Sequence, residues 1–210
     1  KILKDEKIFT NYFFLIFKFF LKSKKFLFNV DKINKNFKLI DNIKKRRDEN
    51  LTFRIINSPN ILIKKNKNFV LSALNLAYLG YFGVEKVCQY KNLYHWPDGY
   101  YSKKIYPNIK KIPGRVMIHK IKDHRNIKTI HVVGNLNPIN KEYLNEKFFN
   151  KEIRNTPLPI LNDKEIRNYV PKLKKGELVL ITLPTPKQEI MAEHLAKINK
   201  NCQNICIGAL

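Results

Sequence analysis

The chain has 210 residues, of which 44% are hydrophobic, so it can bury a core as one domain with an extension, and intrinsic disorder of the whole chain is excluded. A formal net charge of +24 favours anionic partners: nucleic acid, an anionic membrane or phosphate-bearing substrates. The basic residues are nearly all Lys and are spread along the chain without an Arg cluster or a recognisable nucleic-acid module, so no nucleic acid is expected as a partner.

Residues 1–50 form a basic, Phe-rich N-terminal extension that differs from the rest of the chain. Its apolar run at 8–21 is shorter than the roughly 20 residues of a spanning helix, and Lys18 interrupts it. Two interpretations stay open: a helix on the membrane surface, or a segment that packs on the domain. The charged run at 41–50 indicates a solvated linker.

Residues 51–210 alternate between apolar strand patterns and helical patterns, which indicates parallel strands with helices on both faces. We therefore predict an α/β doubly wound, mainly parallel, Rossmann-like domain. The sequence ends in an apolar run, so we expect this domain to be truncated at its C-terminus. The predicted strands are 69–74, 127–133, 178–182 and 205–207, and the predicted helices are 76–82, 138–149, 162–173 and 186–198.

Ligands of such sheets bind beyond the carboxyl ends of the strands, which here directs attention to the loops after Leu74, Val133 and Thr182. The helix after Thr182 begins near Pro186, and its first N–H groups could hold a phosphate. Alternatively, Glu189 complements the helix dipole and Gln188 faces solvent. The residues alone favour neither of these two interpretations over the other.

Two further segments are ambiguous when taken alone. Asp98 lies between Pro97 and Gly99, which either presents a carboxylate at a loop tip or forms a plain turn; the spacing favours the turn. Arg115 could clamp a phosphate, although a surface Arg is the more common case. Gly134 ends a strand without a G-x-G-x-x-G fingerprint.

Metal and cysteine patterns are also lacking. The five His residues have no metal-ligand spacing, and we expect His131 to be a satisfied core residue. No Asp-x-Asp pair occurs that could hold a metal on a nucleotide diphosphate, so no metal and no cofactor are predicted. Cys88, Cys202 and Cys206 form no disulfide framework, and the last two are expected to be buried thiols, as in a reducing compartment.

Taken in order, these segments resemble the WecG/TagA/CpsF family of glycosyltransferases over about residues 51–210. The resemblance rests on a series of short motifs between strands and helices: Asn75, Asp98-Gly99, Gly114-Arg115, Gly134, Pro186-Lys187-Gln188-Glu189 and Ile207-Gly208. The chain departs from the family at Ala73, where a Thr is common, and at Leu183-Pro184-Thr185, where a Gly is usual. The family's basic C-terminal tail is not part of this sequence.

The resemblance implies an inverting, metal-independent transfer of an N-acetylmannosamine-type sugar from a UDP-sugar donor to a glycan on a polyprenyl diphosphate lipid. It also implies a cytoplasmic protein, peripheral on the inner membrane, that acts in cell-surface polysaccharide synthesis. The alternative is a basic, non-catalytic module that binds nucleic acid or membrane.

The resemblance also suggests a role for each residue. Asp98 is the expected general base, and Arg115 and the helix start at Pro186 are expected to stabilise the departing diphosphate. Gln188 is expected to orient donor or acceptor, and Asn75 to bond the sugar. The remaining expected substrate-binding residues are Gly99, Gly134, Asn135, Thr182, Lys187 and Glu189, of which Gly134 and Asn135 let the nucleotide lie against backbone.

Overall fold

The structure, a computed structural model, describes residues 53–65, 68–82, 92–98, 110–122, 124–169, 171–199 and 202–208. The extension predicted for residues 1–50 lies outside these ranges, as do Cys88 and Gly99.

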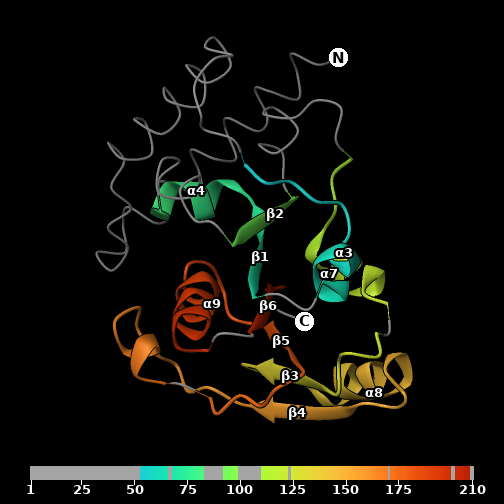
Figure 1. Cartoon of the computed structure of the whole chain (residues 1–210). Helices are drawn as coiled ribbons and strands as arrows, with labels where there is room; N and C mark the ends of the chain where they lie inside the picture. Colours follow the sequence, from blue (N-terminus) through green and yellow to red (C-terminus); the bar gives the residue numbers. More distant parts are fainter. Residues whose placement is uncertain are drawn as a thin grey trace.

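The described residues form one six-stranded sheet in which every pair of neighbouring strands is parallel (Figure 1). The strand order is β2-β1-β6-β5-β3-β4. The strands are β1 (Phe69–Leu74), β2 (Leu93–Pro97), β3 (Thr129–Val133), β4 (Glu152–Thr156), β5 (Glu177–Ile181) and β6 (Gln203–Cys206). An α/β fold built on a parallel sheet is therefore confirmed.

Helices cover both faces of this sheet (Figure 1). The helices α4 (Leu76–Phe82) and α9 (Lys187–Ile198) lie on one side, and α3 (Asn60–Lys64), α7 (Gly114–Lys120) and α8 (Pro138–Lys147) lie on the other. Each face packs its own apolar cluster, and β1, β3 and β5 are buried along their whole length. Strands buried on both faces need continuous apolar runs, which explains why these three were recognisable in the sequence.

Some elements differ from the prediction. The segment 162–173 is not a helix: Asn162 accepts from the backbone N–H groups of Lys164 and Glu165 as a cap does, but only the 3-10 turn η1 (Glu165–Asn168) follows. Pro171 has no N–H and disfavours helical geometry in the residue before it, so the turn cannot continue.

The edge strands β2 and β4 and the short helices α3 and α7 were not predicted. β4 is half exposed and lacks an apolar run, and β2 contains His95 and ends at Pro97. Edge strands of this kind give a weak sequence pattern because their partners, not their composition, define them.

The carboxyl ends of all six strands lie along the same edge of the sheet, because the strands are parallel. From β3 the chain turns outward to β4, whereas from β5 it turns the other way to β6. Connections that diverge between neighbouring strands create a switch point, where open α/β sheets commonly bind ligands.

Candidate functional site

A cleft of about 520 Å³ opens at the carboxyl ends of β1, β2 and β6. Four of the predicted site residues meet in it: Asn75, Asp98, Arg115 and Gln188. They come from four separate segments, spread over more than a hundred positions of the chain. Its remaining lining residues are Ala73, Trp96, Lys111, Pro113, Gly114, Thr185, Cys206, Ile207 and Gly208.

Asp98 reaches the cleft because it directly follows β2. This strand pairs in register with β1, so that Trp96 lies beside Ala73 at the carboxyl ends of both strands. The backbone N–H of Ile112 donates to the carbonyl of Pro97 over 2.7 Å and fixes the end of β2. The prediction left open a carboxylate at a loop tip or a plain turn; the structure places Asp98 in the cleft wall.

Asn75 directly follows β1 and uses one half of its side-chain amide for the fold. Its Oδ1 accepts from the backbone N–H of Tyr78 over 2.9 Å and so stabilises the first turn of α4. Its Nδ2 donates to no acceptor among the described residues. The donor half of Asn75 is therefore the half that can bind a ligand in the cleft.

Among the described residues, two cations line the cleft, Arg115 and Lys111. Arg115 is exposed in the first turn of α7, and the helix start lies directly on the segment after β6. A Cβ on Gly114 would stand 2.8 Å from the carbonyl oxygen of Ile207, so only Gly allows this approach. Lys111 was missed by the sequence reasoning, since one Lys among 41 Lys and Arg carries no signal.

Gln188 lines the cleft, but its side chain is already engaged with the protein. Its Nε2 donates to Thr185 Oγ1 over 3.0 Å and to Glu189 Oε1 over 2.9 Å. Its Oε1 accepts the backbone N–H of Gly208 over 2.9 Å. Both amide protons are therefore used, and one lone pair of Oε1 is left for a ligand.

The start of α9 is less suited to hold a phosphate than the sequence suggested. The backbone N–H groups of Lys187 and Gln188 both point to the carbonyl of Pro184, at 2.9 and 3.3 Å. Amides that are bonded within their own turn are not free to bind an anion. Neither Pro186 nor Lys187 lines the cleft. Arg115 and Lys111 therefore provide the positive charge there.

Pro186, Lys187 and Glu189 lie outside the cleft, and so do three other predicted residues at the switch point between β3 and β5. Thr182 Oγ1 donates to the carbonyl of Asn135 over 3.1 Å, which ties the two loops together. Gly134 has a φ of 118° and packs against Thr182, whose Oγ1 would lie 2.4 Å from any added Cβ. Direct contact between the two loops thus occupies this switch point.

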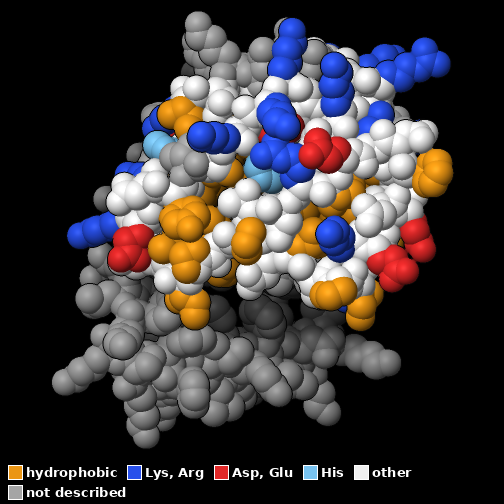
Figure 2. All heavy atoms as spheres, turned by 90° about the horizontal axis from the view of Figure 1, so that it is seen from below, with side chains coloured by type: hydrophobic (Ala, Val, Ile, Leu, Met, Phe, Trp, Pro, Cys, Tyr) orange, Lys and Arg blue, Asp and Glu red, His pale blue; other side chains and the backbone are white. Residues whose placement is uncertain are grey.

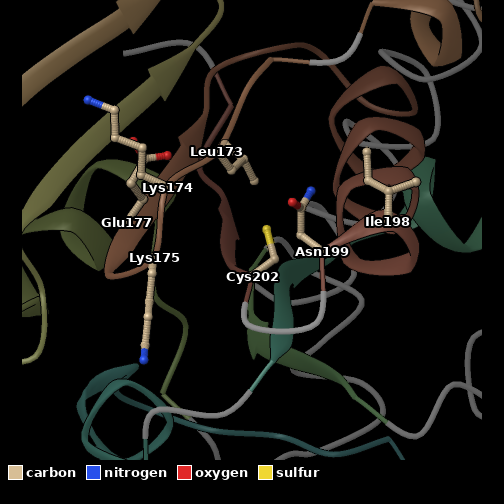
Figure 3. A pocket seen from close by; sticks show the side chains of 7 residues that line it. All are labelled: Leu173, Lys174, Lys175, Glu177, Ile198, Asn199 and Cys202. Carbon is tan, nitrogen blue, oxygen red and sulfur yellow. The ribbon is translucent and has the colours of Figure 1, made fainter.

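A second pocket of about 250 Å³ lies at the opposite, amino-terminal edge of the strands (Figure 3). The side chains of Lys174 and Lys175, which belong to its lining, extend away from its centre (Figure 3). Glu177 in its wall is bonded to His131 Nδ1 over 3.2 Å and to Arg154. The structure thus confirms His131 as a satisfied core residue, because Thr156 Oγ1 bonds its other nitrogen.

The cysteines of the described residues are buried thiols, as predicted. Burial raises the pKa of Cys202 to about 12 and that of Cys206 well above its usual range, so neither ionises at neutral pH. Among the described residues, no group of three or more His, Cys, Asp or Glu side chains could hold a metal ion.

Comparisons of the chain with protein-family models, curated proteins and solved structures found no match.

Proposed function

We propose that the chain is a glycosyltransferase of the WecG/TagA/CpsF type, which moves an N-acetylmannosamine-type sugar from a UDP-sugar to a lipid-linked glycan. One observation carries the proposal. Asn75, Asp98, Arg115 and Gln188, which the resemblance selects from separate motifs, all line one cleft of about 520 Å³ at the carboxyl edge of a parallel sheet. That size is typical of small-molecule sites.

The chemistry is a single displacement with inversion. The acceptor hydroxyl forms a bond to the anomeric carbon while the bond from that carbon to the diphosphate oxygen breaks. The hydroxyl proton passes to the Asp98 carboxylate, and UDP leaves with the electron pair of the broken bond. Asp98 suits the part of general base because it is the acidic side chain among the described residues that line the cleft.

The leaving group gains negative charge as the bond breaks, and cations close to it lower the barrier. Arg115 and Lys111 line the cleft on the side of α7 and supply this charge. The planar guanidinium of Arg115 can bind two phosphate oxygens at once, which Lys111 cannot do. The Nδ2 of Asn75 and the remaining lone pair of Gln188 Oε1 are groups that can bond sugar hydroxyls.

The nucleotide end of the donor would extend from the cleft along the carboxyl edge of the sheet, over the exposed side of the loop at Gly134 and Asn135, because contact with Thr182 fills the switch point itself. The proposal includes a location: the protein would be cytoplasmic and peripheral on the inner membrane. In the part of the chain that the structure describes, no helix is long and apolar enough to cross a membrane.

The test is a screen of the protein against UDP-sugars with a lipid-diphosphate-sugar acceptor, in which UDP release is measured. The proposal expects release that depends on both donor and acceptor. An Asp98→Asn variant that still binds UDP is the matched control, and it should release little UDP. If no UDP-sugar binds or reacts, the proposal is wrong.

The alternative, a basic module that binds nucleic acid or membrane, is tested by titrating RNA, DNA and anionic vesicles against salt. On the face shown in Figure 2, Lys and Arg side chains are interspersed with acidic and hydrophobic ones. Tight, salt-dependent binding to one of these partners, together with failure to bind UDP-sugars, would favour the alternative.

A further inference from the structure

The carboxyl group of Glu189 is buried between α9 and the sheet, with 4% of the residue exposed. Its Oε1 accepts three hydrogen bonds: from Ser72 Oγ over 2.8 Å, from Gln188 Nε2 over 2.9 Å and from Thr185 Oγ1 over 3.2 Å. Ser72 belongs to β1, whereas the other two belong to the segment that begins α9. One oxygen atom thus joins a central strand to the wall of the cleft.

Thr185 and Gln188 line the cleft, but Glu189 itself does not. Gln188 passes the connection on, because its Oε1 holds the backbone N–H of Gly208 over 2.9 Å. The backbone of Gln188 also contacts β6, since Cys206 Sγ donates to the Gln188 carbonyl over 3.6 Å. The path from Glu189 through Gln188 to Gly208 therefore fixes one side of the cleft.

Glu189 has no means of contacting a substrate directly. Its Oε2 is buried and has no hydrogen-bond partner. Burial raises the pKa of the carboxyl group, and no cation among the described residues lies within ion-pair distance of it. An acidic side chain placed here instead of an apolar one needs a structural reason, because an unpartnered buried oxygen destabilises the fold.

We propose that Glu189 is a positioning residue, which sets the orientation of the Gln188 amide and so of the Ile207–Gly208 backbone at the cleft. The proposal rests on the proposed function for its effect on turnover, but its geometric part stands by itself. It requires the acceptor atom Oε1, not a negative charge.

The geometric part is tested by amide hydrogen exchange of Gly208, measured by NMR on the folded protein. Exchange should be slow in the native protein and in Glu189→Gln, because the amide oxygen of Gln can accept the same bonds. It should be at least tenfold faster in Glu189→Ala. Glu193→Ala, on the same helix but paired with Lys197 at the surface, is the matched control and should leave Gly208 unchanged. Equal exchange of Gly208 in the native protein and Glu189→Ala overturns the proposal.

If Glu189→Ala does not fold, Ser72→Ala decides the question, since it removes one of the three donors and Ser72 does not line the cleft. Faster exchange of Gly208 in this variant supports the proposal, and unchanged exchange overturns it. Loss of protection in Glu189→Gln as large as in Glu189→Ala would mean that charge is required, which also overturns it.

The functional part is read from the kinetics of UDP-sugar transfer. In Glu189→Ala, kcat should fall by about tenfold, the effect expected when the displaced Gln188 loses one hydrogen bond to the substrate in the transition state. The KM for the donor should change less. Glu189→Gln should restore kcat to within about twofold of the native value. If the native protein does not transfer from any UDP-sugar, the proposed function fails, whereas the exchange of Gly208 still decides the role of Glu189.

Discussion

Acid should destabilise the fold through His95, which lies in the strand that carries Asp98 to the cleft. His95 is 1% exposed, and burial lowers its pKa from 6.5 to about 3. Because the pKa of His95 is lower in the folded state than in the unfolded state, its contribution to stability is fully present above pH 6.5. This contribution is lost as the pH falls toward 3. The free energy of unfolding should therefore fall by about 2 kcal/mol between pH 7 and pH 5, and by about 4 kcal/mol once pH 3 is reached.

The measurement is urea unfolding at pH 7, 6 and 5 for the native protein and His95→Phe, which fills the site with a ring that cannot be protonated. The variant loses the contact to Tyr78, whose hydroxyl lies 3.3 Å from His95 Nε2, so it is less stable at pH 7. Its stability should nevertheless depend less on pH, by about 1 kcal/mol per pH unit between pH 6 and pH 5.

Burial also lowers the pKa of His131, so some pH dependence should remain in the variant. His119→Gln, at an exposed position of α7, controls for the loss of an imidazole at the surface. The reasoning is refuted if His95→Phe and the native protein lose stability at the same rate between pH 6 and pH 5.

The other predictions concern the cleft. Asp98→Asn should lower kcat by about 10²–10⁴-fold with unchanged affinity for UDP, because only the ability to accept a proton is lost. Steady-state kinetics measure kcat and calorimetry measures the affinity; a kcat equal to that of the native protein would contradict the prediction. Arg115→Ala should raise the KM for the donor about tenfold, because it removes a charged contact to phosphate. Arg125→Ala, at an exposed position before β3, is the control and should leave this KM unchanged. Equal KM values for Arg115→Ala and the native protein would refute the role of Arg115. Transfer should persist in EDTA, and activity that is lost there and restored by magnesium or manganese would show that a metal is needed.

The apolar pattern of the sequence was enough to predict the centre of the sheet. The run from Phe69 to Leu74 is buried at every position, and the prediction gave its bounds correctly. Strands such as β1, β3 and β5 must be apolar on both sides because helices cover both faces of the sheet. The order of strands was not predictable, because residues far apart in the chain pair only in the folded state.

The resemblance selected Asn75, Asp98, Arg115 and Gln188, which line one cleft. The rule that parallel strands end at the same edge accounts for Asn75 and Gln188, but not for Asp98 and Arg115, because β2 and α7 were not predicted. The failure at 162–173 has a local cause, since Asn162 caps the turn as it would cap a helix but Pro171 stops the turn from continuing.

The tertiary structure alone decided how each polar group is used. From the sequence, two interpretations were equal: a ligand site at this helix start, or Gln188 facing solvent with Glu189 complementing the helix dipole. In the fold, Glu189 is buried under α9 against Ser72, and Gln188 holds Gly208. The hydrogen-bond partners come from β1 and from the segment after β6, which lie 117 and 20 positions away in the chain. A Gln or a Glu side chain has several possible hydrogen-bond partners, and only the packing of the fold determines which of them comes within hydrogen-bond distance.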